Sequence, residues 1–555
     1  MTEKEITIEL KKPETIILIG LLITIFILEI MITLPSPIAF GDEGSYARMG
    51  QYMSENKEIP IWLPFWGTKL YKIGFFKPPL WNILLASFYL IFGFSETLTK
   101  VLTPFIAAIL TGLTVFLIGK KVYNKKIGFI ASLITVTIPS FVTYSVLFYT
   151  DILFTFYYTL FVLSLVMAVK DGKKKYWIIS GVFGAFVLLT KDPGYTIFIL
   201  LVMSFLYQIY KKNELHGLLK NYFITILLIA LISGTYFLRS LVYYGTPACV
   251  LPHILPFFSD KGCRISYDYK SVSNANSGTS PSNLFKNGLM NYVYFAYGAN
   301  QIGPFVFPFV FFGFLCGLVI LVYKREKPDI LLLLTLISFL SIATWLTGRD
   351  EETARYSLAL VPIIGLIAAN YYEGVGNFIE NYKKQLALVI FVFVIFFSFM
   401  NLNSKLSDAR HYDSSSQQYV GFKMFSPSFF QAIDFIKRNT TNDALIATVW
   451  DSQTEYNAQR NVVGLRILPD ANDIVYSGDL NLTLSRLKAN GITHLFIQKF
   501  SMTDEYYPTS FVQFLESNGK NFVKIYENGP SVDECIKAGG CDGNIVYDIK
   551  YDLKK

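Results

Sequence analysis

Charged residues are scarce in this chain of 555 residues, of which 16% are charged and 52% are hydrophobic. A soluble globular protein carries about 25% charged residues. Internal repeats, heptads and low-complexity tracts are absent as well, which excludes a repeat protein and a coiled coil. The composition therefore predicts a bundle of membrane-spanning helices.

Residue types that bind metals are also few. None of the 4 histidines has ligand spacing with another, so no metal motif is visible. Of the 5 cysteines, Cys249 and Cys263 share one predicted outer loop, and Cys535 and Cys541 lie six positions apart near the C-terminal end. Two disulfides on an oxidising face and free thiols in a reducing setting both fit this spacing.

Apolar runs long enough to cross a bilayer fill the first two thirds of the sequence. No cleavable signal peptide is evident, because residues 1–13 carry charges of both signs and the run 15–35 is long enough to span. We interpret this run as a retained anchor. Further runs of about 20 residues lie at 99–119, 127–146, 150–169, 177–190, 194–210, 220–238, 303–323, 329–347, 355–372 and 384–401.

Short basic loops between these runs predict their orientation. Although the net charge is +8, the cations are spread over loops in the positive-inside pattern and form no nucleic-acid patch. With the N-terminus in the cytoplasm, every basic cluster lies inside only if the aromatic segment 80–94 does not cross. We predict that this segment lies along the outer interface. The chain then has about 11–13 spans. The basic clusters lie at 120–126, 170–175, 211–220, 324–327 and 383–384.

The composition changes at about residue 402. An amphipathic run at 428–438 precedes a β-branched run at 444–449, and the helix-then-strand pattern recurs at 482–498 and 508–528. Such alternation favours a small α/β domain. We therefore predict a membrane domain over 1–401 and an extracytoplasmic α/β domain over 402–555.

Ionisable and aromatic side chains stand where the predicted outer loops meet helix ends. They are Asp42, Glu43, Tyr46, Lys77, Asp151, Lys191, Arg239, Arg355 and Tyr356. The predicted topology puts all of them at one membrane face. Ionisable groups at the edge of a bilayer are costly to place, so their presence there indicates a functional site. Single residues of this set also have simpler explanations. Asp151 could be a helix N-cap, and the arginines could extend to the interface only so that water solvates their guanidinium groups.

This set of residues suits glycosyl transfer from a lipid phosphate. The leaving phosphate carries its own negative charge, so it needs cations and no general acid. Arginine gives forked contacts with phosphate and lysine a point contact. The attacking hydroxyl must lose its proton, and a carboxylate within hydrogen-bond reach can accept it. Asp42, Glu43 and Asp151 are the candidate catalytic carboxylates.

Six segments resemble the GT-C glycosyltransferases of the protein O-mannosyltransferase and aminoarabinose-transferase superfamily. They occur in the family's order and are 42–53, 76–85, 147–161, 188–194, 238–247 and 354–364. The resemblance implies a GT-C fold and an enzyme that uses a polyprenyl-phosphate sugar on the outer membrane face. The acceptor would be a hydroxyl of a protein, a glycan or a lipid.

The resemblance also implies roles for individual residues. Asp42 would be the base. Lys77 and Arg239 would hold the donor phosphate, and Asp151 would support the site. To the phosphate site we add Arg355 and Tyr356, and to the substrate site Tyr46 and Lys191. Members of the aminoarabinose branch often have a Glu before the KPP motif where this chain has Phe76, so we assign no metal ligand and leave a divalent metal open.

Two other classes of protein compete with the enzyme. A transporter or flippase would place charges near the middle of broken spans, whereas the charges here stand at helix ends. A membrane scaffold with a sensory outer domain would not need converging ionisable residues. Within the enzyme class, oligosaccharyltransferases carry a WWDYG motif, of which this chain has only Trp450-Asp451. We interpret that pair as the end of a strand.

Overall fold

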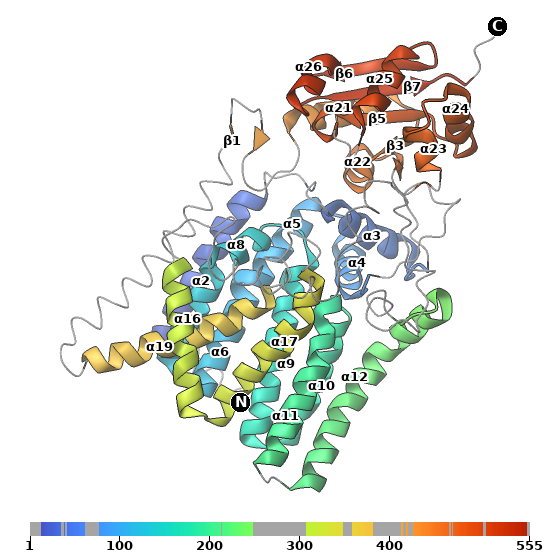
Figure 1. Ribbon diagram of the computed structural model, residues 1–555. Coiled ribbons are helices and arrows are strands. Elements are labelled where there is room, and N and C mark those ends of the chain that lie inside the picture. The colour runs from blue at the N-terminus through green and yellow to red at the C-terminus, as the bar shows by residue number, and fades with distance from the viewer. Residues whose placement is uncertain are drawn as a thin grey trace.

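A computed structural model describes two connected parts of the chain, a helical bundle and a C-terminal sheet domain above one end of it (Figure 1). The described residues are 13–34, 38, 42–61, 77–211, 214–247, 307–347, 358–380, 412–413, 418–419, 426–465, 468, 470–502 and 507–551.

Helices joined by short connections make up the bundle. In chain order they are α2 (Pro13–Thr33), α3 (Glu43–Asn56), α4 (Leu80–Phe92), α5 (Glu96–Pro104), η1 (Phe105–Thr111), α6 (Gly112–Val122), α7 (Lys125–Thr137), α8 (Pro139–Ser145), α9 (Thr150–Asp171), α10 (Lys174–Leu188), η2 (Asp192–Tyr195), α11 (Thr196–Tyr210), α12 (Leu215–Tyr244), α16 (Phe307–Lys324), α17 (Lys327–Thr347), η3 (Leu358–Leu360) and α19 (Val361–Glu380).

Five helical segments among the described residues are long and apolar enough to cross a membrane, so the chain is a multi-pass membrane protein. They are Glu96–Val122, Thr150–Asp171, Asp192–Tyr210, Leu215–Tyr244 and Leu358–Val375. The predicted total of about 11–13 crossings stays a prediction. Helix α4 has 13 residues, too few for a straight crossing, and it packs on α3. Its predicted place along the outer interface also stays a prediction.

Small residues and internally bonded hydroxyls let the apolar helices pack closely. A Cβ at Gly128 would lie 2.5 Å from the carbonyl oxygen of Phe116, so only glycine permits this approach of α7 to α6. The hydroxyls of Thr155 and Thr159 donate to the carbonyls of Asp151 and Thr155, one turn earlier in α9. These bonds satisfy polar groups that have no water available in the bundle core.

Several basic loops gather at one end of the bundle. Lys170 donates from Nζ to the carbonyl of Lys121, and the Tyr123 hydroxyl donates to Asp329 in the first turn of α17, next to the basic cluster at 324–327. Helix α9 begins at Thr150 and reaches this end after 22 residues. A helix of that length rises about 33 Å, roughly the thickness of a bilayer's hydrocarbon core. The two ends of the bundle are therefore about one membrane apart.

A mixed five-stranded sheet forms the core of the C-terminal domain, in the order β4-β3-β5-β7-β6. Strands β3, β4 and β5 run parallel, and β7 runs antiparallel to both β5 and β6. The strands are β3 (Leu445–Thr448), β4 (Asn461–Gly464), β5 (His494–Gln498), β6 (Phe522–Asn528) and β7 (Asn544–Ile549). A separate small pair joins β1 (Tyr412–Asp413) to β2 (Gln418–Tyr419).

Helices connect these strands, as the repeated helix-then-strand pattern predicts. They are α21 (Pro427–Asn439), α22 (Asp451–Ala458), α23 (Ala471–Val475), α24 (Leu480–Ala489), η5 (Lys499–Ser501), α25 (Thr509–Ser517) and α26 (Val532–Ala538). The C-terminal α/β domain is thus confirmed, while the boundary predicted at 401/402 lies outside the described residues. Trp450-Asp451 is not the end of a strand, contrary to our interpretation, because β3 ends at Thr448, Trp450 is the N-cap of α22 and Asp451 is the first residue of that helix.

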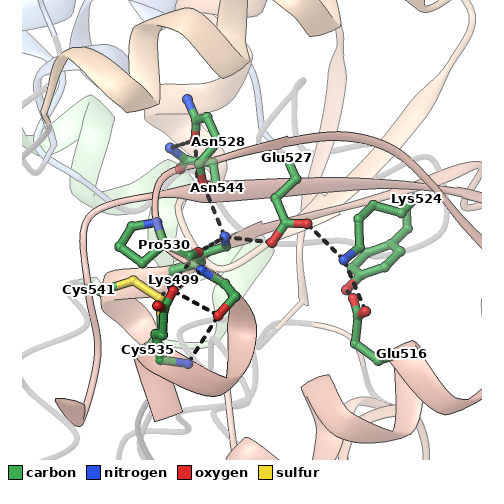
Figure 2. Close-up of polar contacts among 12 residues, drawn as sticks. Lys499, Glu516, Lys524, Glu527, Asn528, Pro530, Cys535, Cys541 and Asn544 are labelled. Carbon is green, nitrogen blue, oxygen red and sulfur yellow. Dashed lines mark hydrogen bonds and ion pairs between the residues drawn. A yellow bond between two sulfur atoms is a disulfide. The ribbon is translucent and has the colours of Figure 1, made fainter. Parts of the chain in front are cut away.

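A buried lysine ties the edge of the sheet to the loop before α26 (Figure 2). The Lys499 ammonium is fully buried and donates to Glu527 at 2.7 Å, to the carbonyl of Asn528 at 3.1 Å and to the carbonyl of Pro530. Its three donors therefore all have acceptors. A disulfide between Cys535 and Cys541 closes the loop after α26. The other pair considered in the sequence, Cys249 and Cys263, lies outside the described residues.

The Lys499 cluster predicts a pH-dependent loss of stability. Burial alone would raise the pKa of Glu527, but hydrogen bonds from Lys499 and Lys524 outweigh it and lower the pKa. A carboxylate whose pKa is lowered by folding stabilises the fold above its unfolded pKa of about 4.3. That contribution is lost as the pH falls through the lower, folded pKa.

We expect Glu527→Gln to destabilise the protein at pH 7 by about 1.5–3 kcal/mol, because a charged hydrogen bond to a buried ammonium is lost. Thermal unfolding of the purified protein at pH 7 and at pH 3.5 measures the effect. The gap between variant and wild type should narrow at the lower pH. An equal gap at both pH values would contradict the role assigned to the ionised carboxylate.

Candidate active site

The turn between α8 and α9 contacts both residues of the acid pair, Asp42 and Glu43. Its Phe148 backbone N–H donates to Glu43 Oε1 at 2.6 Å, and Tyr149 Oη accepts from the Asp42 backbone N–H at 3.3 Å. Glu43 is only 5% exposed. This contact places a buried carboxylate at the first position of α3 and brings the acid pair beside a turn more than 100 residues later in the sequence.

Asp42 pairs with Lys77 across this site. Lys77 Nζ lies 3.0 Å from Asp42 Oδ2, and both side chains are about two fifths exposed. The same ammonium lies 4.8 Å from the centre of the Tyr46 ring, one turn further along α3. The sequence offered Asp42 no local partner, and the structure supplies one 35 positions away. Asp42, Tyr46 and Lys77 therefore form one group.

Asp151 and Lys191 form a second ion pair, and this one is buried. Asp151 is 1% exposed and Lys191 is 13% exposed. The simpler role of Asp151 as an N-cap is not observed, because the N-cap position of α9 is Tyr149. The pair therefore joins the start of α9 to the connection that precedes η2, at the same end of the bundle as Asp42.

Arg239 reaches the site from the last part of α12. Its Nη2 donates to the carbonyl of Pro60, and its Cζ lies 5.9 Å from the centre of the Tyr244 ring. Its Nη1 is buried and has no hydrogen-bond partner among the residues that the structure describes. One turn earlier, the Tyr236 hydroxyl donates to the Lys77 carbonyl at 2.9 Å. Arg239 and Lys77 are thereby held on neighbouring segments.

Two predicted residues of the phosphate site cannot be placed, and one acid that received no role lies close to the site. Arg355 and Tyr356 lie outside the described residues. Asp192 was visible next to Lys191 in the sequence but received no role, and its carboxylate interacts electrostatically with both Lys191 and Lys77. No group of three or more His, Cys, Asp or Glu side chains suited to a metal ion occurs in the searched, described part of the chain.

Glu29 is a carboxyl group of this region that the sequence analysis missed. It is fully buried in α2, where its Oε1 accepts from the Ser145 hydroxyl at 2.7 Å. Its Oε2 has no hydrogen-bond partner within the described residues. The available signal was one acid inside a long apolar run. Glu29 thereby holds the last residue of α8, which leads into the turn whose Phe148 contacts Glu43.

We expect Glu29 to matter for activity more than for stability. Glu29→Leu removes the acceptor for Ser145, and one such hydrogen bond contributes only about 0.5–1.5 kcal/mol to stability. The turn that contacts Glu43 would then be less well placed, so we expect activity to fall by about tenfold or more. Glu29→Gln keeps an oxygen for Ser145 and should retain most activity. Turnover and thermal unfolding of both variants test this. Equal activity in Glu29→Leu and wild type would show that Glu29 only packs.

Sequence and structure comparisons agree on the class of fold. A family model described as dolichyl-phosphate-mannose-protein mannosyltransferase matches residues 76–237. No curated protein matches the chain by sequence. The matched segment contains Lys77, Asp151 and Lys191, and it ends two residues before Arg239.

Solved structures match nearly the whole chain. The oligosaccharyltransferase of Archaeoglobus fulgidus in its apo form gives a TM-score of 0.61 at 15% identity, covering 97% of this chain and 75% of that one. The same organism's AglB, in complex with an inhibitory peptide and a dolichol-phosphate, gives 0.60 at 16% identity, covering 97% and 74%. ArnT from Cupriavidus metallidurans bound to undecaprenyl phosphate gives 0.57 at 11% identity, covering 97% and 98%. The chain therefore has the GT-C fold.

Proposed function

We propose that this chain, which has the GT-C fold, is a membrane glycosyltransferase that moves a sugar from a polyprenyl-phosphate donor to a hydroxyl acceptor at the outer membrane face. The observation that carries this proposal is the partly unsatisfied Arg239 guanidinium, one helical turn after Tyr236, whose hydroxyl contacts the carbonyl of Lys77, the partner of Asp42. A protein hydroxyl, a glycan or a lipid could be the acceptor.

The cations of the site suit a phosphate that leaves with its own charge. Arg239 Nη1 is a buried donor whose partner is missing among the described residues, and such a group is costly unless a ligand satisfies it. Lys77 adds a point charge on the adjoining segment. Solved relatives bound to dolichol-phosphate and undecaprenyl phosphate support this class of donor. Arg355 and Tyr356 remain proposed members of the phosphate site.

The pairing of Asp42 with Lys77 suggests how donor binding would prepare the base. In the structure the ammonium lies 3.0 Å from the carboxylate, and a nearby cation disfavours protonation of a carboxylate. A donor phosphate that binds Lys77 would compete for the same ammonium. Asp42 would then be a stronger base for the acceptor hydroxyl. Glu43 would orient α3, and Asp151 with Lys191 would hold the wall of the site.

The proposed orientation follows from the two ends of the bundle. Lys121 and Lys170 meet at one end, and the positive-inside rule favours this end as cytoplasmic. The candidate site lies at the other end, beside the C-terminal domain (Figure 1). We therefore propose a cytoplasmic N-terminus, a catalytic membrane domain over 1–401, and an extracytoplasmic domain over 402–555 that controls access of the acceptor.

Incubation with a panel of polyprenyl-phosphate sugars tests the proposed function. The purified protein should consume at least one of them, with products identified by mass spectrometry, and release polyprenyl phosphate. A matched panel of nucleotide sugars should give no transfer. Consumption of nucleotide sugars alone, or of no donor in the presence of peptide, glycan, lipid and water as acceptors, would contradict it.

A further inference from the structure

A polar helix of the C-terminal domain rests directly on the helix that begins with the acid pair. Helix α22 follows β3, packs on α3, and carries the buried residues Ser452 and Glu455 on its contact side. The Asn457 side-chain amide donates to the Ile38 carbonyl at 3.1 Å, just before the acid pair in sequence. This contact joins a domain made largely of residues after 426 to the first loop of the bundle.

Gly44 permits the closest approach between the two helices. A Cβ at Gly44 would lie 2.7 Å from the Ser452 carbonyl oxygen and 3.3 Å from the Tyr456 Cβ. The backbone of α22 therefore touches α3 two residues after Asp42. Any larger side chain at Gly44 must push the two helices apart, because the nearest atom belongs to the backbone.

Two further residues of α22 reach into the bundle. Glu455 is 7% exposed on its side chain and lies 3.6 Å from Arg48 Nε of α3. Tyr456 packs against the core of the bundle and interacts with Glu43 and Glu96, and burial raises the pKa of its hydroxyl. One partly exposed ion pair contributes only about 0–1 kcal/mol, so the fit of backbone and aromatic ring must carry most of this contact.

We infer that α22 is a positioning element for the candidate base: the C-terminal domain holds the start of α3, and thereby sets where Asp42 and Glu43 stand. This inference rests on the proposed function for its catalytic consequence, though not for the contact itself. The proposed donor-binding residues Lys77 and Arg239 belong to other segments: Tyr236 holds the Lys77 backbone carbonyl and the Pro60 carbonyl holds the Arg239 guanidinium, although the Lys77 ammonium also contacts Asp42. Loss of the α22 contact should therefore impair turnover more than donor binding.

Gly44→Leu is the variant that separates the two helices, and Gly20→Leu is its matched control. A Cβ at Gly20 would meet nothing within 4 Å, so the control adds the same side chain without a clash. Hydrogen exchange of the peptide 43–56 reports the contact without any substrate. Initial rates with a polyprenyl-phosphate sugar report turnover and the donor KM.

We expect faster exchange in α3 of Gly44→Leu and a fall in kcat of about 10–100-fold, the scale of a misplaced catalytic group, with donor KM nearly unchanged. Gly20→Leu should match wild type in each measurement. Unchanged exchange in Gly44→Leu, or a rise in KM without loss of kcat, would overturn the inference. If wild type used no donor, the proposed function would fail while the exchange result would still decide whether α22 holds α3.

A charge exchange covers the case in which Gly44→Leu does not fold. Arg48→Glu places two acids at the α22 contact and should lower kcat and speed exchange in α3. Adding Glu455→Arg should restore both toward wild type. As a control, Arg486→Glu reverses the charge of an arginine of similar exposure, which pairs with Asp473 inside the C-terminal domain, and it should leave exchange in α3 unchanged. Failure of the double variant to recover either quantity, with wild-type folding, would contradict the positioning role.

Discussion

Asp42→Asn should abolish most sugar transfer while leaving donor binding intact. Asparagine keeps the size of the side chain and its ability to hydrogen-bond Lys77, but it cannot accept the proton of the attacking hydroxyl. Removing a general base typically costs about 10²–10⁴-fold in rate. Single-turnover rates with a bound polyprenyl-phosphate sugar measure the effect, and equilibrium binding of polyprenyl phosphate supplies the independent readout.

Glu55→Gln provides the control for this prediction. Glu55 belongs to the same helix and is exposed near its far end, where it accepts a hydrogen bond from Gln51. Neutralising it should leave transfer within about twofold of wild type, as exposed substitutions usually do. Near wild-type transfer by folded Asp42→Asn would remove Asp42 from the role of base.

Asp151→Leu should be strongly destabilising as well as inactive. The substitution leaves the Lys191 ammonium, 13% exposed, without the carboxylate that neutralises it. Breaking a buried ion pair by removing one partner costs about 3–5 kcal/mol. Thermal unfolding of the purified protein measures this loss, and a transfer assay on the surviving folded fraction measures activity.

The double variant Asp151→Leu with Lys191→Met separates stability from function. An apolar pair of similar volume often equals or exceeds a buried ion pair in stability, so unfolding should return close to wild type. Activity should stay low if the charged pair shapes the site. Recovery of full activity together with stability would mean that this pair serves the fold alone.

The elements of the C-terminal domain were largely predictable from local pattern. Runs at 428–438, 482–498 and 508–528 alternate an apolar helix period with β-branched strands, and they correspond to α21, α24 with β5, and α25 with β6. Helix α22 was not predicted, because its residues DSQTEYNA show no apolar stripe. It packs on α3 as well as on β4 and α21, and no local pattern reveals these contacts.

The candidate site was predictable by residue type but not by pairing. Charge distribution alone assigned Asp42, Lys77, Asp151 and Lys191 to one membrane face, and the structure brings them to one end of the bundle. The pairing of Asp42 with Lys77 depends on how α3 and α4 pack, which tertiary contacts decide. Glu29 was overlooked because a single acid in an apolar run has no visible partner in sequence.

A structure with bound polyprenyl phosphate tests the central claim most directly. We expect the phosphate oxygens to contact Lys77 Nζ and Arg239 Nη1, and the distance from Lys77 Nζ to Asp42 Oδ2 to lengthen beyond its present 3.0 Å. Asp42 would then face the bond between sugar and phosphate. A phosphate bound elsewhere, with the pair of Asp42 and Lys77 intact and Arg239 out of reach, would show that these cations do not form the donor site.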